Sequence, residues 1–378
     1  MAYGTVQADV IGTSVAGSNL GAGNASIMKN RIINGAMVID QRNAGASVNT
    51  TSASAAVYTL DRWYYFASQT SKFTIQQNAG SVTPPVGFTN YLGVTSSSAY
   101  SIGSGELFSI SQSIEGFNIA DLGWGTASAK TVTLSFWVRS SLTGTFGGSI
   151  TNGSQNRSYP FSYTISSANT WEQKSVTVVG DTSGTWITNN GIGMTVWLGL
   201  GVGSTISGTA GSWSGSTYYS ATGATSVVGT NGATFYITGV QLEVGSSATG
   251  FEYRMYSTEL VNCQRYFEKT YSQNVALGTS TESNVEWSGT SFQSLASTGT
   301  FQAQLRPFKV VKRAAPTMTF WDFVGNSGKW TRYFVGVGPS NNNTVSVDTQ
   351  DDCGFRMFVA SGSNTSNCCG HWAASSEL

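Results

Sequence analysis

Short apolar runs rich in β-branched and aromatic residues recur along most of this 378-residue chain, and stretches of Gly, Ser, Asn and Thr separate them. That pattern is typical of strands joined by turns, because branched and aromatic side chains suit a pleated surface. The expected strands of the first part are 32–39, 60–66, 73–77, 107–114, 132–138, 159–165, 172–178, 192–198 and 235–242. Together they predict a β-sandwich.

The run 132–138 shows the two-residue period of a strand most clearly. Val132, Leu134, Phe136 and Val138 fall on one face, and Trp137 falls on the other. We expect the first face to meet the core and the second to be partly covered. No repeat of fixed period is visible, which argues against a propeller or a β-helix.

Charged residues make up only 10% of the chain, and the 19 basic residues balance the 19 acidic ones. Soluble domains usually carry about 25%. So few cations leave no footprint for phosphate groups, so nucleic acid is not an expected partner, and binding to a membrane through a basic face is disfavoured. Because little charge repulsion keeps copies apart, we expect a homo-oligomer.

Neither the N-terminal residues nor the uncharged stretch in the middle of the chain indicates membrane insertion. Residues 1–6 lack the basic and apolar regions of a secretory signal, which predicts synthesis in the cytoplasm. The uncharged stretch 191–203 is interrupted by Gly, Thr and Ser, so it is expected to form a strand and not a membrane-spanning helix.

The pattern of residues divides the chain into four parts. Residues 1–30 are small and polar and predict an extended N-terminal arm that becomes ordered against a partner, with a frayed terminus as the alternative. Residues 31–250 carry the sandwich, 251–272 a linker helix, and 273–378 a second, smaller β domain. The expected fold class is therefore all-β, with one short helix.

The helix is predicted from the spacing of its apolar residues. Tyr256, Leu260, Cys263 and Phe267 recur at helical intervals, and Ser257 can cap the first turn.

Three parts of the sequence resemble bacteriophage tail-fibre and tail-tip proteins that carry a jelly roll similar to carbohydrate-binding modules. They are NRIINGAMVIDQR at 30–42 with LDRW at 60–63, VQLEVG at 240–245 with FEYR at 251–254, and ELVNCQRYF at 259–267. Downstream, RAAPT at 313–317 and WAASSEL at 372–378 are similar to the C-terminal domains of such proteins. Between about 85 and 230 nothing matches in detail.

The resemblance implies a jelly-roll sandwich in a structural virion protein, made in the host cytoplasm. It further implies a tail fibre that adheres to host surface glycans, a homotrimer, and attachment to other virion proteins through the N-terminal arm. Two alternatives stay open: a capsid decoration or head-fibre protein, and a tail-spike polysaccharide depolymerase.

Catalytic residue sets are scarce, so we do not expect an enzyme or a cofactor. His371 is the only histidine and lies in a Gly/Cys-rich stretch expected to form a turn, which disfavours a nucleophile–histidine–acid triad. Glycoside hydrolysis needs only two carboxylates about 5 to 10 Å apart. The candidates for it are Asp61, Glu106, Glu115 and Asp121.

The four cysteines are expected to be free thiols in a reducing compartment, and no metal is expected. Cys353, Cys368 and Cys369 could form a zinc site with His371, but their spacing lacks the CxxC pattern of structural zinc sites. No acidic calcium-binding loop is visible, and a calcium ion held by carbonyls stays open.

Sugar recognition uses aromatic faces for stacking together with neutral hydrogen-bonding groups. Trp186, Trp213, Tyr218 and Tyr219 lie in Gly/Ser-rich segments expected to be loops, so they are the candidate glycan-binding residues. Alternatively, they cap the sandwich or pack between subunits. Such loop aromatics have less chance of being core residues than Trp63, Trp137 and Trp197, which lie in strand runs.

Arg42, Asp61 and Arg62 lie near expected strand ends. We interpret these opposite charges as a buried structural ion pair and not as ligand-binding residues.

Overall fold

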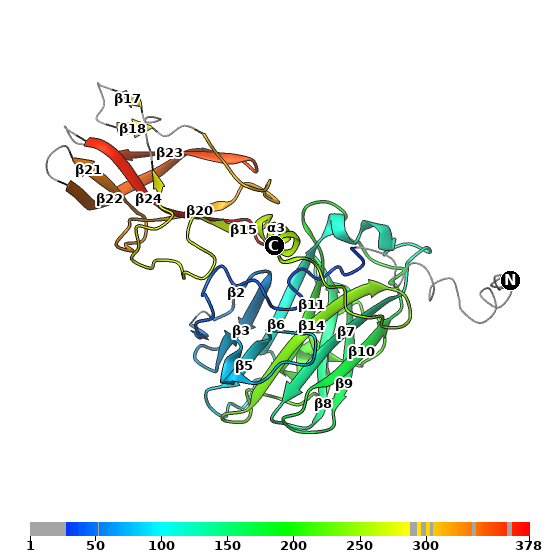
Figure 1. Ribbon diagram of the computed structural model, residues 1–378. Helices are drawn as coiled ribbons and strands as arrows, with labels where there is room; N and C mark the ends of the chain where they lie inside the picture. The colour runs from blue at the N-terminus through cyan, green and yellow to red at the C-terminus, as the bar shows by residue number, and fades with distance from the viewer. Residues whose placement is uncertain are drawn as a thin grey trace, which may run out of the picture. The chain divides into compact units, whose positions relative to one another are not determined.

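The computed structural model describes residues 28–51, 53–287, 293–295, 300–302, 305–334, 338–360 and 365–378. These residues form mostly β-strands, with one α-helix among them, so the all-β prediction is confirmed. The chain folds into two compact units (Figure 1). Most of the arm expected at 1–30, residues 1–27, lies outside the described residues.

Two six-stranded sheets build the first unit, in the orders β1-β4-β5-β14-β7-β10 and β2-β3-β6-β11-β8-β9. The strands are β1 (Val48–Asn49), β2 (Ala56–Leu60), β3 (Trp63–Ala67), β4 (Phe73–Gln77), β5 (Leu92–Ser96), β6 (Leu107–Glu115), β7 (Val132–Ser140), β8 (Gly144–Asn152), β9 (Ser158–Ile165), β10 (Glu172–Val178), β11 (Ile192–Val202) and β14 (Thr234–Val244). β12 (Ser207–Gly208) and β13 (Ser220–Ala221) form a small separate pair.

The order of pairing identifies a jelly roll. β8 pairs with β9, β7 with β10, β6 with β11 and β5 with β14, each antiparallel, so four nested pairs are wound across two sheets. The predicted jelly-roll sandwich is therefore confirmed. Its core lies between the sheets, where Ile110, Leu134, Phe136, Leu198 and Ile237 are fully buried.

Three expected features of this unit differ in the structure. Residues 32–39 form turns and not a strand, with positive φ at Asn34 (58°) and Met37 (59°). The expected strand 60–66 is split by a turn in which Arg62 has φ 69°. Strands β5 and β8 were not expected. The three glycines of β8 resemble a loop, yet a side chain at Gly148 would overlap Phe161 and the carbonyl of Trp197.

The second unit contains the C-terminal part of the chain. The helix is α3 (Tyr256–Gln264), and the strands are β15 (Phe267–Lys269), β16 (Glu286–Trp287), β17 (Gln293–Leu295), β18 (Thr300–Gln302), β19 (Arg306–Pro307), β20 (Thr317–Trp321), β21 (Lys329–Phe334), β22 (Gly338–Gln350), β23 (Gly354–Ala360) and β24 (Thr365–Ser375). Strand β24 pairs with β15, β16, β20 and β21, and it contains His371, which we expected in a turn.

The helix starts one residue before its expected cap. Met255 occupies the N-cap position without a side-chain hydrogen bond, and Ser257 lies inside the helix. Phe267, the last residue of the expected apolar stripe, belongs to β15 and is buried against Tyr271 and Trp321.

Two segments from the N-terminal part also belong to the second unit. Residues 39–48 and 58–63 fold with 255–378, whereas we expected them in a continuous sandwich domain at 31–250. The physical reason is a buried charge cluster around Glu377. Arg42 Nη2 donates to Glu377 Oε1 at 2.9 Å, and Arg62 Nη1 donates to Glu377 Oε2.

Aromatic rings complete this cluster. The guanidinium of Arg42 lies 3.8 Å from the ring centre of Phe267, and that of Arg62 lies 3.6 Å from the ring centre of Tyr266. The interpretation of Arg42 and Arg62 as structural is confirmed, but their partner is Glu377. Asp61 instead accepts hydrogen bonds from the main-chain and side-chain nitrogens of Gln41, at 2.7 and 2.6 Å.

Replacing Glu377 with Gln leaves two buried guanidinium groups without their counter-charge, so we expect the second unit to lose about 3 kcal/mol of unfolding free energy. Hydrogen-exchange mass spectrometry in urea reads the two units separately. The control is Asp121→Asn, which removes an exposed ion pair with Arg31 and is expected to cost less than about 1 kcal/mol. Equal protection of 39–48 and 58–63 in wild type and Glu377→Gln contradicts the role of the cluster.

Burial raises the pKa of Asp61 to about 6, against the opposing effects of Arg42 and Gln41. Because the folded pKa exceeds the unfolded value of about 3.9, this carboxyl favours folding most below pH 4, and that contribution is lost as the pH rises through 6. We expect the second unit to lose about 3 kcal/mol in this way, and Asp61→Asn to remove this pH dependence. Urea denaturation at pH 4, 5, 6 and 7 measures the difference. Parallel curves for the two proteins would show that Asp61 titrates normally.

Candidate functional site

The predicted glycan-binding tryptophans pack against one another at one end of the sandwich. Trp186 is only 7% exposed, and its ring meets those of Trp124 and Trp213 edge-on at 4.7 and 5.5 Å between centres. Trp213 is half-buried and also contacts Tyr159 at 5.2 Å. Trp186 is therefore buried in the aromatic cap, which favours the capping alternative over a stacking role for this residue.

The two predicted tyrosines lie on a segment that covers the sheet containing β8 and β11. The ring of Tyr219 packs on Trp197 at 4.7 Å, and its hydroxyl donates to Gln155 Oε1 at 2.7 Å. Tyr218 lies against Gly208, where a methyl group would overlap its ring. Both tyrosines are half-buried. The contacts described for these four residues are thus with the sandwich itself.

Trp137 differs from the other tryptophans of this unit. It points away from the core on β7, between core residues Phe136 and Val138, and it is half-buried. Trp124, Trp171, Trp186, Trp197 and Trp213 all donate their indole N–H to a protein acceptor. Within the described part of the unit, the N–H of Trp137 has no such acceptor.

A pocket of about 400 Å³ lies between strand β10, which pairs with the strand of Trp137, and the loop that follows β14. Gln173, Lys174 and Ser175 form the strand wall, and Ala248, Thr249 and Gly250 form the loop wall. Gln173 is the cross-strand neighbour of Trp137, so their side chains project from the same face of the sheet. We call Trp137 and this pocket together the Trp137 groove.

The strand wall offers neutral hydrogen-bonding groups. Gln173 and Ser175 are exposed, and neither side chain bonds to another described residue. The one charged side chain of the wall, Lys174, donates to Glu172 Oε2 at 2.6 Å, so its charge is paired. The pocket can therefore bond hydroxyl and amide groups without offering a free charge to an ion.

Further aromatic rings continue from the other side of Trp137. Gly239 has a φ of 60°, and a methyl group there would lie 2.6 Å from Phe88 and 3.1 Å from Trp137, so both rings reach over the strand at this point. Phe88 packs against Phe251 and Tyr253 at 5.1 and 5.5 Å. The groove thus has an apolar aromatic end and a polar end.

The sequence contained one signal for this site, the alternation that places Trp137 opposite Leu134, Phe136 and Val138. The alternation placed Trp137 on the partly covered outer face, and its half-buried side chain confirms this. It was not chosen as a binding residue because an aromatic residue in a strand run has a greater chance of being core than one in a loop. The contribution of the loop 248–250 could not be found from sequence, because it depends on the tertiary path after β14.

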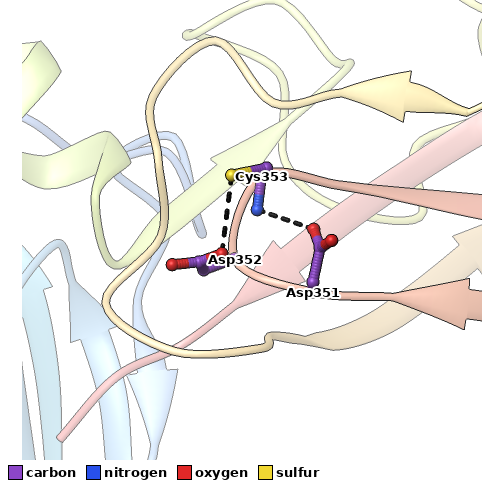
Figure 2. Close-up of side chains that lie close together, drawn as sticks. All are labelled: Asp351, Asp352 and Cys353. Carbon is purple, nitrogen blue, oxygen red and sulfur yellow. Dashed lines mark hydrogen bonds between the residues drawn. The ribbon is translucent and has the colours of Figure 1, made fainter.

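Figure 2 shows one group of possible metal ligands, Asp351, Asp352 and Cys353 in the turn between β22 and β23. All three are exposed. Asp351 Oδ1 accepts the backbone N–H groups of Cys353 and Gly354 at 2.8 and 2.9 Å. These bonds shape the turn, so the group serves as a turn cap.

The four residues of the possible zinc site do not come together in the structure. Cys368 and Cys369 are adjacent on this strand and belong to different buried clusters, whereas Cys353 is exposed in the turn before β23. His371 is fully buried, with Nδ1 bonded to Thr270 and Nε2 to the carbonyl of Thr281, and burial lowers its pKa. Among the described residues these four side chains form no metal cluster.

The carboxylates considered for glycoside hydrolysis are also dispersed. Glu106 precedes β6 and Glu115 ends it, so about 30 Å of strand separates them. Asp121 pairs with Arg31 at 2.7 Å, and Asp61 is part of the second unit. Glu106 and Glu115 are thus too far apart to act as the pair of carboxylates that glycoside hydrolysis needs.

In the part of the chain that the structure describes, no helix has the length and apolar character needed to cross a membrane.

No protein-family model matches this chain, and no curated protein does. Solved structures do. The enzymatically active domain of tailspike protein 4 from bacteriophage CBA120 matches at 12% identity and a TM-score of 0.33, over 57% of this chain and 22% of that one. A family 11 carbohydrate-binding module from Clostridium thermocellum, in complex with a mixed-linked tetrasaccharide, matches at 11% identity and a TM-score of 0.26, over 52% of this chain and 96% of the module.

The chain thus spans less than a quarter of the tailspike's length and about the whole of the module. At these identities and TM-scores the likeness carries no argument about ligand or partner.

The unfolding free energies of two alanine variants, Trp186→Ala and Trp137→Ala, distinguish a core tryptophan from one in the groove. Trp186→Ala opens a cavity in the aromatic cap and is expected to lower the unfolding free energy of the first unit by about 3 to 5 kcal/mol, whereas Trp137→Ala is expected to cost about 1 to 2 kcal/mol. Urea denaturation of the two variants measures both. A larger loss for Trp137→Ala would place Trp137 in the core and remove it from the candidate site.

Proposed function

We propose that the first unit is a non-catalytic glycan-binding module, and that the chain is a structural subunit of a bacteriophage virion, a tail fibre that adheres to host surface glycans. The observation that carries the first part is the Trp137 groove. It combines an outward-facing indole whose N–H has no protein acceptor with the unpaired side chains of Gln173 and Ser175.

Sugars offer an apolar ring face and a rim of hydroxyl groups, and the groove matches both. An indole face stacks on the apolar side of a sugar ring, and amide and hydroxyl side chains bond to its hydroxyls. The pairing of Lys174 with Glu172 leaves the polar end without a free charge, which favours a neutral sugar over an anionic one. Phe88 and Phe251 extend the apolar surface toward a second sugar ring.

The virion part of the proposal rests on the sequence segments that resemble phage tail proteins. Four of these segments meet in the charge cluster of the second unit, to which they contribute Arg42, Arg62, Tyr266, Phe267 and Glu377. A shared structural role for these segments explains why they occur together in one chain. A homotrimer on the particle surface, attached through the N-terminal arm, completes the proposal.

The proposed module holds its ligand without cleaving it. Of the four carboxylates considered for hydrolysis, none lines the Trp137 groove. Retention of polysaccharide without chain scission is the expected behaviour.

Binding of the full-length protein to an array of bacterial envelope polysaccharides tests the proposal. We expect Trp137→Ala to raise the dissociation constant at least tenfold, because a stacking ring is lost. The double variant Gln173→Ala with Ser175→Ala is expected to raise it several-fold. Thr164→Ala is the matched control, since Thr164 is an exposed strand residue of β9 outside the groove.

The same samples are assayed for new reducing ends, of which none are expected. Three results would contradict the proposal: no polysaccharide retained, equal affinity of wild type and Trp137→Ala, or release of reducing ends that Trp137→Ala abolishes.

A further inference from the structure

The two walls of the groove's pocket are held in different ways. The strand wall is part of β10, whose seven residues all pair with β7. The loop wall has no strand partner and depends on the carboxylate of Glu243. Glu243 Oε1 accepts the N–H of Thr249 at 2.8 Å, and Oε2 accepts the hydroxyl of Thr249 at 2.6 Å.

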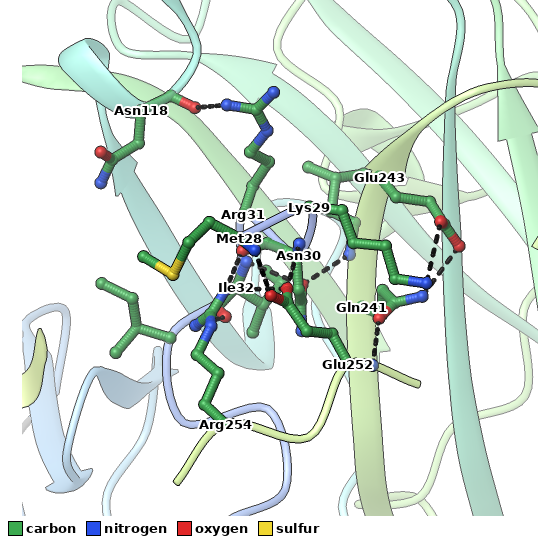
Figure 3. A network of polar contacts seen from close by, with 12 residues as sticks. Met28, Lys29, Asn30, Arg31, Ile32, Asn118, Gln241, Glu243, Glu252 and Arg254 are labelled. Carbon is green, nitrogen blue, oxygen red and sulfur yellow. Dashed lines mark hydrogen bonds and ion pairs between the residues drawn. The ribbon is translucent and has the colours of Figure 1, made fainter. Parts of the chain in front are cut away.

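Glu243 is buried, with its side chain 2% exposed, so its charge needs compensation. Lys29 supplies it: the Nζ of Lys29 lies 3.9 Å from Glu243 Oε2. The same Nζ donates to the hydroxyl of Thr249 and, at 2.8 Å, to the carbonyl of Gly250. One ammonium group therefore contacts two of the three residues of the loop wall as well as the carboxylate that holds them. Figure 3 shows Lys29 next to Glu243.

The residues on either side of Lys29 are fixed to the same region. Met28 N donates to Glu252 Oε1, and Asn30 N donates to Glu252 Oε2 at 2.7 Å. Asn30 Nδ2 donates to the carbonyl of Val240 in β14 at 3.1 Å. The first described residues of the chain thus bind β14 and the loop after it, more than 200 positions later in the sequence.

We propose that Lys29 is a positioning residue of the Trp137 groove, which sets the distance between its loop wall and its strand wall. This inference rests on the proposed glycan-binding function. Its consequence is that residues 28–30, the described end of the expected N-terminal arm, contribute to glycan affinity. Without the ammonium group, Glu243 is a buried charge with no compensating cation, and Thr249 and Gly250 lose their shared donor.

Full-length Lys29→Met tests this with two readouts. Hydrogen-exchange mass spectrometry reports the amides of 246–252 without any ligand, and we expect at least tenfold faster exchange there than in wild type, with β10 unchanged. When Lys29→Met is titrated with a polysaccharide that wild type binds, we expect a dissociation constant five to ten times higher than that of wild type. Lys29→Arg keeps the cation and is expected to restore most of both.

Arg31→Met is the matched control. Arg31 lies two residues away and bonds to the carbonyl of Asn118 and to Asp121, outside the groove, so neither readout is expected to change. Glu243→Gln is the second variant and is expected to loosen 246–252 as Lys29→Met does. It decides the question if Lys29→Met does not fold.

The outcomes separate the two proposals. If the amides of 246–252 exchange in Lys29→Met and Glu243→Gln as they do in wild type, Lys29 does not position the loop. The positioning role is also overturned if these amides exchange faster but Lys29→Met keeps wild-type affinity for a polysaccharide that Trp137→Ala no longer binds. If wild type and Trp137→Ala bind equally, the proposed function fails, while the exchange measurement still shows whether Lys29 positions the loop.

Discussion

Every strand of a two-layer sandwich has one face in the core and one face toward solvent, and this constraint determines where the protein can bind anything. On β7, the core face is occupied by Leu134, Phe136 and Val138, which forces Trp137 outward. The rolled order of strands then places Gln173 of β10 beside it. The groove follows from the alternation of side chains and from the pairing of β7 with β10.

Several of the few charged residues are buried within a single unit of the fold. From the sequence, 10% charged residues suggested burial between subunits. The structure places several of these charges in buried pairs within single units: Glu377 with Arg42 and Arg62, Lys312 with Glu268 at 2.6 Å, and Glu243 with Lys29. Such pairs contribute little net stability but fix which segments meet, because an unpaired buried charge is costly.

The sequence predicted the sandwich because several strands carry a clear two-residue period, and it predicted where the helix begins but not that the helix ends before Phe267. It missed β8, whose glycines are required by close packing against Phe161, and it placed 39–48 and 58–63 in the wrong unit. That error has a physical cause: the partner of Arg42 and Arg62 is Glu377, about 315 positions or more away, and no local pattern reveals it.

For the candidate site, loop composition favoured Trp186 and Trp213, although aromatic residues in Gly-rich segments also serve as caps, as the Trp124–Trp186–Trp213 cluster does. The strand residue Trp137 was set aside for the opposite reason. Exposure on a sandwich depends on which face has no covering layer, and that is settled by the tertiary fold and not by local sequence.

A crystal structure of the full-length protein with an oligosaccharide from a polysaccharide that it retains tests the central claim most directly. The account predicts a sugar ring stacked on Trp137 at van der Waals distance, with hydroxyl groups bonded to Gln173 or Ser175. A sugar bound at Trp213 and Tyr219, or anywhere else away from the Trp137 groove, would contradict it.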